Sequence, residues 1–128
     1  MDWTNSEGSK GIILVVDDHP LILKLVQAML DGAGLDIVTA DHPDQAVRLA
    51  AKHRERIRLL LTDLHMGSMS GEDLAGKVLE LCPGLRVLFM SGARSDDLRF
   101  AASVHHDFIE KPFTPAELTR RVEALLAI

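Results

Sequence analysis

Five short apolar runs, each closed by a polar or charged residue, constrain this 128-residue chain more than any other feature. The first run, "GIILVV", is rich in β-branched residues and stops at Asp17-Asp18, and the third, "IRLLLTD", ends on Asp63. Apolar runs of this length, bounded by turn residues, are typical of strands buried on both faces of a sheet. The predicted strands cover 11–16, 35–40, 57–63, 85–92 and 106–111.

The segment after the first strand predicts a helix. Pro20 suits the first helical turn, because the N–H that proline lacks would have no partner there. Gly32 and Gly34 favour the end of the helix. The apolar residues that repeat at helical spacing are Leu21, Leu25, Ala28 and Met29.

Four further helices are predicted over 42–53, 71–81, 95–104 and 114–128, and the pattern over 95–104 is the weakest. The last helix begins with a capping box formed by Thr114 and Glu117, and Pro115 suits its first position. The expected inward faces are Ala46, Leu49, Ala50 and His53 in the helix 42–53, Leu74, Val78 and Leu81 in the helix 71–81, and Leu118, Val122 and Leu125 in the helix 114–128.

Strands and helices therefore alternate along the whole chain. This order predicts parallel strands joined by crossover helices on both faces, which is a doubly wound α/β fold with a five-stranded parallel sheet. The length fits one domain over 11–128, and the polar stretch 1–10 is expected to be a disordered lead-in. In open sheets of this type, ligands bind beyond the carboxyl ends of the strands.

The composition argues against several classes of protein. A net charge of -5 is unlike a nucleic-acid-binding surface, and no apolar run approaches the ~20 residues of a membrane span. The N-terminal stretch has no apolar core of a signal peptide. The single cysteine, Cys82, rules out an internal disulfide and fits a reducing compartment, so we expect a cytoplasmic location.

Polar side chains follow four of the five predicted strands. They are Asp17-Asp18, Asp63, Ser91 and Lys111, and the parallel arrangement brings them to one edge of the sheet. Two like charges ~4 Å apart at an effective dielectric of ~20 repel by about 4 kcal/mol. Three clustered carboxylates therefore need a cation, either Lys111 or a divalent metal, and oxygen ligands favour magnesium.

These groups are the parts that phosphoryl transfer needs. A lysine and a metal neutralise charge, a hydroxyl positions the phosphoryl group, and a carboxylate can form an aspartyl-phosphate. Asp63 is the best candidate for the nucleophile. Each residue taken alone also fits a turn or a helix cap, but their placement at one edge of the predicted sheet favours a site.

Four segments, "ILVVDDHP", "LLLTDLHMGSMSG", "VLFMSG" and "DFIEKPF", resemble the successive signatures of response-regulator receiver domains of the chemotaxis-regulator type. The resemblance runs from about Gly11 to the C-terminus. It implies a flavodoxin-like (βα)5 fold with strand order 2-1-3-4-5. The segment "PGLRVLFMSG" is also similar to receivers of hybrid histidine kinases, so both a stand-alone regulator and a receiver of a larger protein stay open.

The resemblance also implies roles for individual residues. Asp63 would be the phospho-acceptor, and Mg²⁺ would be held by Asp17, Asp18, Asp63 and the backbone carbonyl of His65. Ser91 would hydrogen-bond the phosphoryl group, and Lys111 would pair with one of its oxygens. The resemblance further implies a cis peptide bond at Lys111-Pro112, a closing glycine at Gly71 and an aromatic switch residue at Phe108, coupled to Ser91.

Several residues of this chain depart from the family pattern or stand where the lifetime of the phosphorylated form is set. Gly67 stands where the family has proline, which predicts a more mobile loop. His65 and Ala93 flank the path of the water that hydrolyses the phosphorylated form. His105-His106 replaces the usual glycine-alanine pair. We interpret both rings as solvated and pointing in different directions.

The expected function is two-component phosphorelay signalling. A histidine kinase or phosphotransfer protein would donate to Asp63, and the modified domain would change shape to regulate an output protein through the predicted fourth helix, fifth strand and last helix. We expect no direct contact with nucleic acid or membrane and no conventional enzyme activity beyond its own phosphorylation and dephosphorylation. The alternatives are a receiver-like module that works without phosphorylation, a magnesium-dependent aspartyl-phosphate phosphatase, and a flavodoxin.

Overall fold

The protein is described here from a computed structural model that places residues 11–32, 34–92 and 104–128. Five strands form one sheet: β1 (Ile12–Val16), β2 (Asp36–Ala40), β3 (Ile57–Asp63), β4 (Arg86–Ser91) and β5 (His106–Glu110). The order is β2-β1-β3-β4-β5 and every pair is parallel, as predicted. The predicted lead-in 1–10 and nearly all of the predicted helix 95–104 lie outside the described residues.

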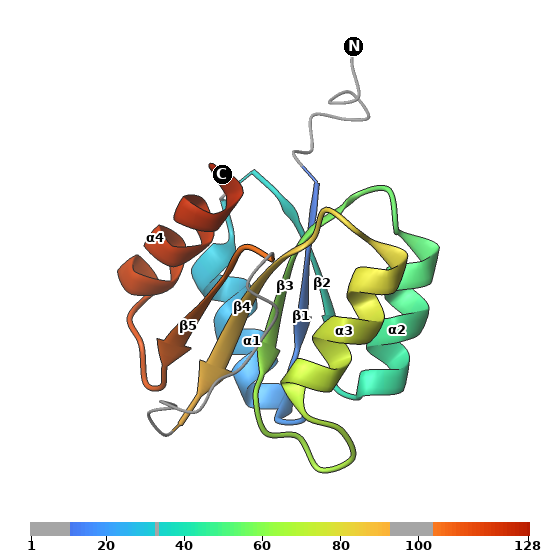
Figure 1. Ribbon diagram of the computed structural model, residues 1–128. Helices are drawn as coiled ribbons and strands as arrows, with labels where there is room; N and C mark the ends of the chain where they lie inside the picture. Colours follow the sequence, from blue (N-terminus) through green and yellow to red (C-terminus); the bar gives the residue numbers. More distant parts are fainter. Residues whose placement is uncertain (1–10, 33, 93–103) are drawn as a thin grey trace.

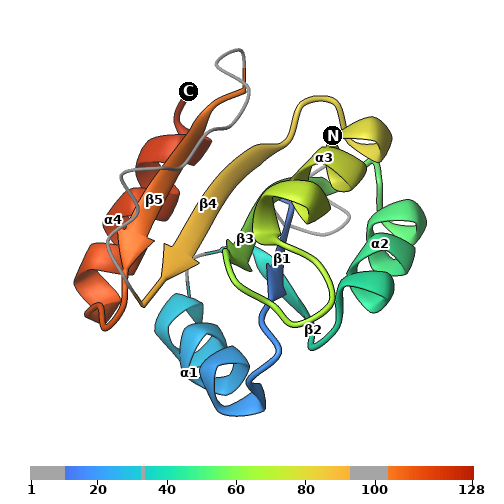
Figure 2. The ribbon, with the colours of Figure 1, turned by 60° about the horizontal axis from the view of Figure 1, so that its bottom comes forward.

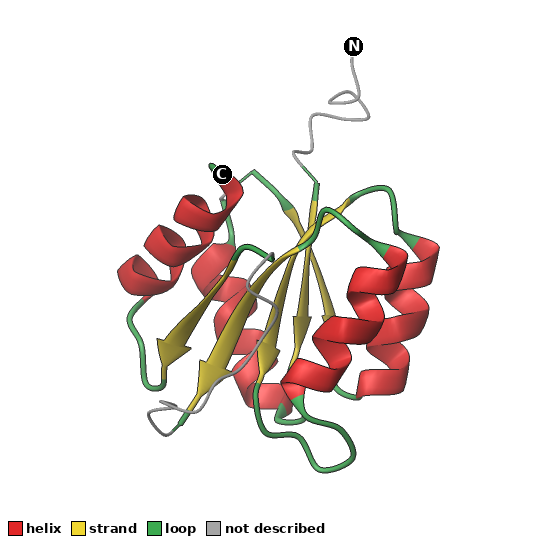
Figure 3. Cartoon of the chain, viewed as in Figure 1, coloured by secondary structure: helices red, strands yellow, loops and turns green. Residues whose placement is uncertain are grey.

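Four described helices cover the sheet: α1 (Pro20–Leu30), α2 (Pro43–Lys52), α3 (Gly71–Leu81) and α4 (Pro115–Leu126). Helices α2 and α3 lie on one face, and α1 and α4 lie on the other (Figure 1). Coloured by secondary structure, the molecule shows the sheet as a central layer between helices (Figure 3). The α/β sandwich expected from the alternation of elements is therefore confirmed.

The sheet has a hydrophobic core on each side because its strands alternate their side chains between two covered faces. In β1 every residue is buried. Ile12, Leu14 and Val16 belong to the core beneath α2 and α3, whereas Ile13 and Val15 belong to the core beneath α1 and α4. A continuous apolar run, in place of an alternating one, is thus what a strand at the centre of this sheet requires.

Helix α1 buries a different face from the one that the spacing indicated. Leu21 and Leu25 are 67% and 47% exposed, and Ala28 is also exposed. The buried residues are Leu23, Val26 and Leu30. Met29 is half-buried against this core, but the prediction was wrong for the other three residues, because the helix has enough apolar residues for two stripes. Packing against the sheet and α4 selects one of them, and the other remains at the surface.

The other helices bury their predicted faces. Leu118, Val122 and Leu125 of α4 are buried, as are Leu74 and Val78 of α3 and Ala46 and Ala50 of α2; Leu49, His53 and Leu81 are half-buried. The capping box of α4 is formed, with Thr114 N donating to Glu117 Oε1 and Glu117 N donating to Thr114 Oγ1, both at 3.1 Å. Local signals and packing therefore agree for these three helices.

Candidate functional site

The residues predicted to converge lie at the edge of the sheet where the strands end, called here the carboxyl-end rim. Asp17 directly follows β1, Asp63 ends β3, Ser91 ends β4 and Lys111 directly follows β5. Figure 2 is turned so that this edge comes forward. Residues from four separate parts of the sequence therefore meet at one rim, as the fold rule predicts.

Lys111 joins two of the carboxylates. Its Nζ lies 3.1 Å from Asp17 Oδ2 and 3.6 Å from Asp63 Oδ1. The side chains of Asp17 and Asp63 are 0% and 7% exposed, so both carboxylates have lost most of their water. A buried carboxylate is costly unless a cation or hydrogen bonds compensate it, and the Lys111 ammonium supplies the first compensation.

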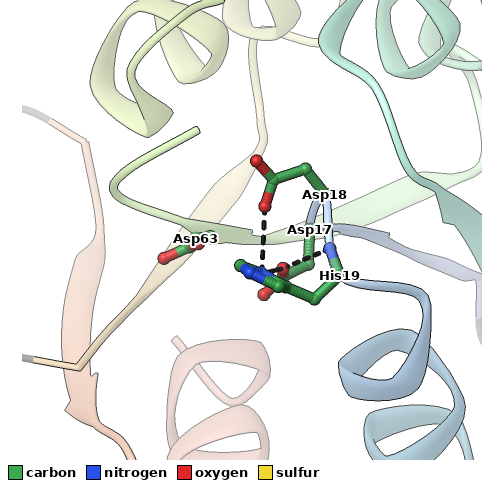
Figure 4. A group of neighbouring side chains, drawn as sticks. All are labelled: Asp17, Asp18, His19 and Asp63. Atoms are coloured by element: carbon green, nitrogen blue, oxygen red, sulfur yellow. Dashed lines mark hydrogen bonds and ion pairs between the residues drawn. The ribbon is translucent and has the colours of Figure 1, made fainter. Parts of the chain in front are cut away.

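His19 is a further titratable side chain of this cluster, and the sequence interpretation did not include it. Its Nδ1 lies 3.0 Å from Asp17 Oδ1 and 3.0 Å from Asp18 Oδ1, and its backbone N–H donates to Asp17 Oδ1 at 2.9 Å. Figure 4 shows the ring beside both carboxylates, near Asp63. The only sequence signal was its position immediately after the Asp pair.

The carboxylates change the pKa of this histidine. The hydrogen bond to Asp17 and the negative charges of Asp17 and Asp18 raise the pKa of His19 above its usual value. Lys111 acts in the opposite direction, with a smaller effect. The acidic environment therefore favours a cationic imidazole when no metal ion is bound.

Asp63 has a raised pKa for a different reason. Loss of water around the buried carboxyl raises its pKa most, and the nearby Asp17 and Asp18 add to this, whereas Lys111 and the backbone N–H of His65 lower it. That N–H lies 3.4 Å from Asp63 Oδ1. A carboxylate that is desolvated and incompletely neutralised is a stronger nucleophile and a better cation ligand than a solvated one.

Three carboxylates of this cluster fit a magnesium ion. Asp17, Asp18 and Asp63, together with His19, each offer one ligand atom, and these atoms all lie within 4.8 Å of one another. Carboxylate oxygens are the ligands that Mg²⁺ prefers, and the exposure of Asp18 leaves room for waters and phosphate oxygens. We call the group formed by Asp17, Asp18 and Asp63 the acidic pocket.

The two predicted switch residues occupy neighbouring strands. Ser91 is buried at the end of β4, one residue beyond Met90, which pairs with Asp63. Phe108 is half-buried on β5, where it pairs with Phe89. Arg121 of α4 holds this strand, because its Nη1 donates to Phe108 O at 2.6 Å and to Asp107 Oδ2 at 3.1 Å. The peptide bond between Lys111 and Pro112 is cis, as expected.

The structure places most of the residues that distinguish this chain from the family pattern. An added Cβ at Gly67 would meet no atom within 4 Å, so the loop leaves open space there. His105 is exposed, but His106 is half-buried, packs edge-on against Phe89 and has its Nδ1 2.8 Å from Val104 O. The interpretation of a solvated histidine pair is therefore wrong for His106, because the strand turns it inward. Ala93 lies outside the described residues.

Gly71 fixes the distance between α3 and the pocket. A Cβ at this position would collide with the backbone carbonyl oxygen of Asp63. Gly71 N also donates to Leu64 O at 2.9 Å, and Ser70 caps the helix by accepting from Asp73 N at 3.0 Å. The start of α3 therefore lies directly against the strand end that carries Asp63, and only glycine allows this approach.

Residues 13–123 match the response regulator receiver domain family, and the chain belongs to this family. It is therefore a receiver domain of the kind found in two-component response regulators. A 14.6 kDa protein of Leptolyngbya boryana is 36% identical over 87% of this chain and 86% of that protein. The transcriptional regulatory protein TcrX of Mycobacterium tuberculosis is 32% identical over 94% of this chain, which spans about half (52%) of TcrX.

Solved structures show the same fold. The receiver domain of the hybrid histidine kinase CckA has a TM-score of 0.78 and 25% identity, and the match covers 91% of this chain and 99% of that one. A receiver domain of Clostridium thermocellum has a TM-score of 0.81 and 24% identity over 91% of this chain and 94% of that one. Receiver domains generally bind Mg²⁺ at an acidic pocket, and this chain has one.

Proposed function

We propose that the domain over 11–128 accepts a phosphoryl group on Asp63 from a phosphohistidine of a histidine kinase or phosphotransfer protein. The observation that carries the proposal is the position of Lys111 between Asp17 and Asp63, which joins the last strand to the first and the third. The reactive carboxylate therefore has a fixed cation beside it, in the place where a phosphoryl oxygen needs one. The comparison with receiver domains supports the same role.

The chain's own residues would act as follows. Asp63 would attack the phosphorus with one carboxylate oxygen, and the P–N bond to the donor imidazole would break as the P–O bond forms. Lys111 would pair with a phosphoryl oxygen, and the Ser91 hydroxyl would donate to another. Asp17, Asp18, Asp63 and the His65 carbonyl would hold Mg²⁺. When bound, the metal neutralises charge on the phosphoryl oxygens and orients them.

A donor protein would dock on an apolar surface that adjoins the pocket. A cavity of about 160 Å³ lies between α1 and the segment after β5, lined by Ile22, Leu25, Val26, Met29, Lys111, Pro112 and Phe113. Lys111 belongs both to this cavity and to the acidic pocket. A helix whose apolar residues filled the cavity would bring its phosphohistidine next to Asp63.

Phosphorylation would then change the output surface. Ser91 would move toward the phosphoryl group and Phe108 would turn inward, which alters the face formed by β5 and α4. The output protein that reads this face belongs to a cytoplasmic pathway in our proposal. No helix of the described residues is long and apolar enough to cross a membrane.

The test is incubation of the purified chain with Mg²⁺ and a small phosphodonor, followed by intact-mass measurement. The wild type should gain one phosphoryl group, and Asp63→Asn should gain none. Glu80→Gln, which removes an exposed acid from α3, is the matched control and should behave as the wild type. A wild type that stays unmodified by both small donors and a phosphorylated histidine kinase would favour a phosphorylation-independent module.

A further inference from the structure

We propose that His19 Nδ1 is a ligand of the metal in the acidic pocket, so that this pocket takes a first-row transition-metal ion as well as Mg²⁺. The inference deepens the proposed function, because it rests on the metal site assigned to Asp17, Asp18 and Asp63. It adds a nitrogen ligand to a set that is otherwise composed of oxygens.

The distances around His19 fit a coordination shell. In an octahedral shell with metal–ligand bonds of about 2.1 Å, adjacent ligand atoms are separated by about 3.0 Å. Nδ1 of His19 lies 3.0 Å from an oxygen of Asp17 and 3.0 Å from an oxygen of Asp18. The ring nitrogen therefore already has the spacing of a neighbouring ligand with respect to both carboxylates.

The placement of His19 allows this role without rebuilding the fold. His19 is the N-cap residue of α1, but its side chain makes no capping hydrogen bond. The side chain is 68% exposed, so the ring can shift to let an ion enter. Within the group of neighbouring ligand atoms found among the described residues, His19 supplies the only nitrogen. Its Nε2 would then keep the proton while Nδ1 binds the ion.

An imidazole nitrogen changes which metals the site prefers. Mg²⁺ selects oxygen ligands, whereas the affinity of mixed nitrogen and oxygen sites rises from Mn²⁺ through Fe²⁺ and Co²⁺ to Ni²⁺ and Cu²⁺. A receiver with His19 in the shell would therefore discriminate between Co²⁺ and Mg²⁺ more strongly than one without it. The ligand class is a divalent transition ion bound by three carboxylates and one imidazole.

The experiment compares two metals in untagged protein. Isothermal titration calorimetry should show that His19→Ala weakens Co²⁺ binding by about tenfold or more, as removal of a metal-site residue typically does, and leaves Mg²⁺ binding within about threefold. His19→Gln, which keeps a polar side chain at the N-cap, should give the same selective loss. Spin-echo modulation of the Mn²⁺-loaded wild type should show a coupled imidazole nitrogen that both variants lack.

Two control variants test whether the nitrogen comes from this histidine. His53→Ala and His105→Ala should both keep the imidazole signal, because neither ring belongs to the cluster. Equal weakening of Co²⁺ and Mg²⁺, no change in either, or tighter binding of both in His19→Ala would overturn the proposal. The two proposals can fail separately. The role of His19 is tested by metal selectivity, whereas the proposed function is tested by transfer of phosphate to Asp63.

Discussion

Lys111 Nζ lies 3.1 Å from Asp17 Oδ2, although the two residues are 94 positions apart in the sequence. The contact joins the segment after the last strand to the end of the first strand. It also brings the ammonium to 3.6 Å from Asp63 Oδ1, so that one cation serves two buried carboxylates. Lys111 therefore competes with any metal for the same negative charge.

Replacement of Lys111 by alanine should abolish phosphorylation of Asp63 but strengthen Mg²⁺ binding. The carboxylates lose their shared cation, and the repulsion between the Lys111 ammonium and a divalent ion bound to the same carboxylates disappears. We expect Mg²⁺ to bind Lys111→Ala about tenfold more tightly by calorimetry. The conservative variant Lys111→Arg should keep affinity near the wild type, and equal affinities for all three proteins would contradict this account.

Replacement of Asp63 by asparagine should stabilise the fold at neutral pH in the absence of metal. The pKa of Asp63 is raised by burial, so the folded state binds its proton more tightly than the unfolded state. Ionised Asp63 therefore opposes folding above the raised pKa, and this opposition disappears as the pH falls below the unfolded value of about 3.9. Urea unfolding followed by circular dichroism should show a gain of about 1 kcal/mol at neutral pH.

The gain from Asp63→Asn should shrink as the pH is lowered through the raised pKa toward the unfolded value. Glu80→Gln, an exposed substitution, should show no such pH-dependent difference. A variant that is less stable than the wild type at neutral pH would mean that attraction to Lys111 outweighs the loss of water.

Replacement of Gly71 by alanine should destabilise the domain by about 1–3 kcal/mol, the usual cost of overpacking. The new methyl group would collide with the carbonyl oxygen of Asp63 and push α3 away from β3. Gly76 provides the matched control within the same helix, because a Cβ there meets no atom within 4 Å. Gly76→Ala should therefore stabilise by about 0.5–1 kcal/mol, and the two substitutions should move the unfolding midpoint in opposite directions.

Replacement of Leu25 by serine should slow phosphotransfer from a protein donor without affecting reaction with a small phosphodonor. Leu25 lines the apolar cavity beside Lys111 and is 47% exposed, so it is available to a partner and contributes little to the core. Truncation of an apolar anchor at an interface typically costs about 1–2 kcal/mol or more, which is about tenfold in affinity. Transfer is measured from a phosphorylated histidine kinase at several receiver concentrations.

The control for Leu25 is Gln27→Ser, which changes an exposed residue of α1 outside this cavity. Its rate of transfer should match the wild type. Equal slowing by both variants would point to a general effect on the helix, and slowing with the small donor would point to damage in the acidic pocket.

Much of this architecture was predictable because local physical signals agree with the final packing. The five apolar runs gave the strands, the capping box of Thr114 and Glu117 gave the start of α4, and the alternation of elements gave the parallel sheet. The positions of Asp17, Asp63, Ser91 and Lys111 at the strand ends then followed from topology alone. The family resemblance supplied their roles, which stay predictions.

The sequence by itself determined which residues stand at the carboxyl-end rim, because the order of strands and helices fixes where each strand ends. The tertiary structure decided which side chains touch. It exposed Leu21 and Leu25, since a helix with two apolar stripes can bury only one of them against the sheet. It turned His106 inward and placed the ring of His19 against two carboxylates, because such contacts depend on side-chain directions that spacing along the chain does not specify.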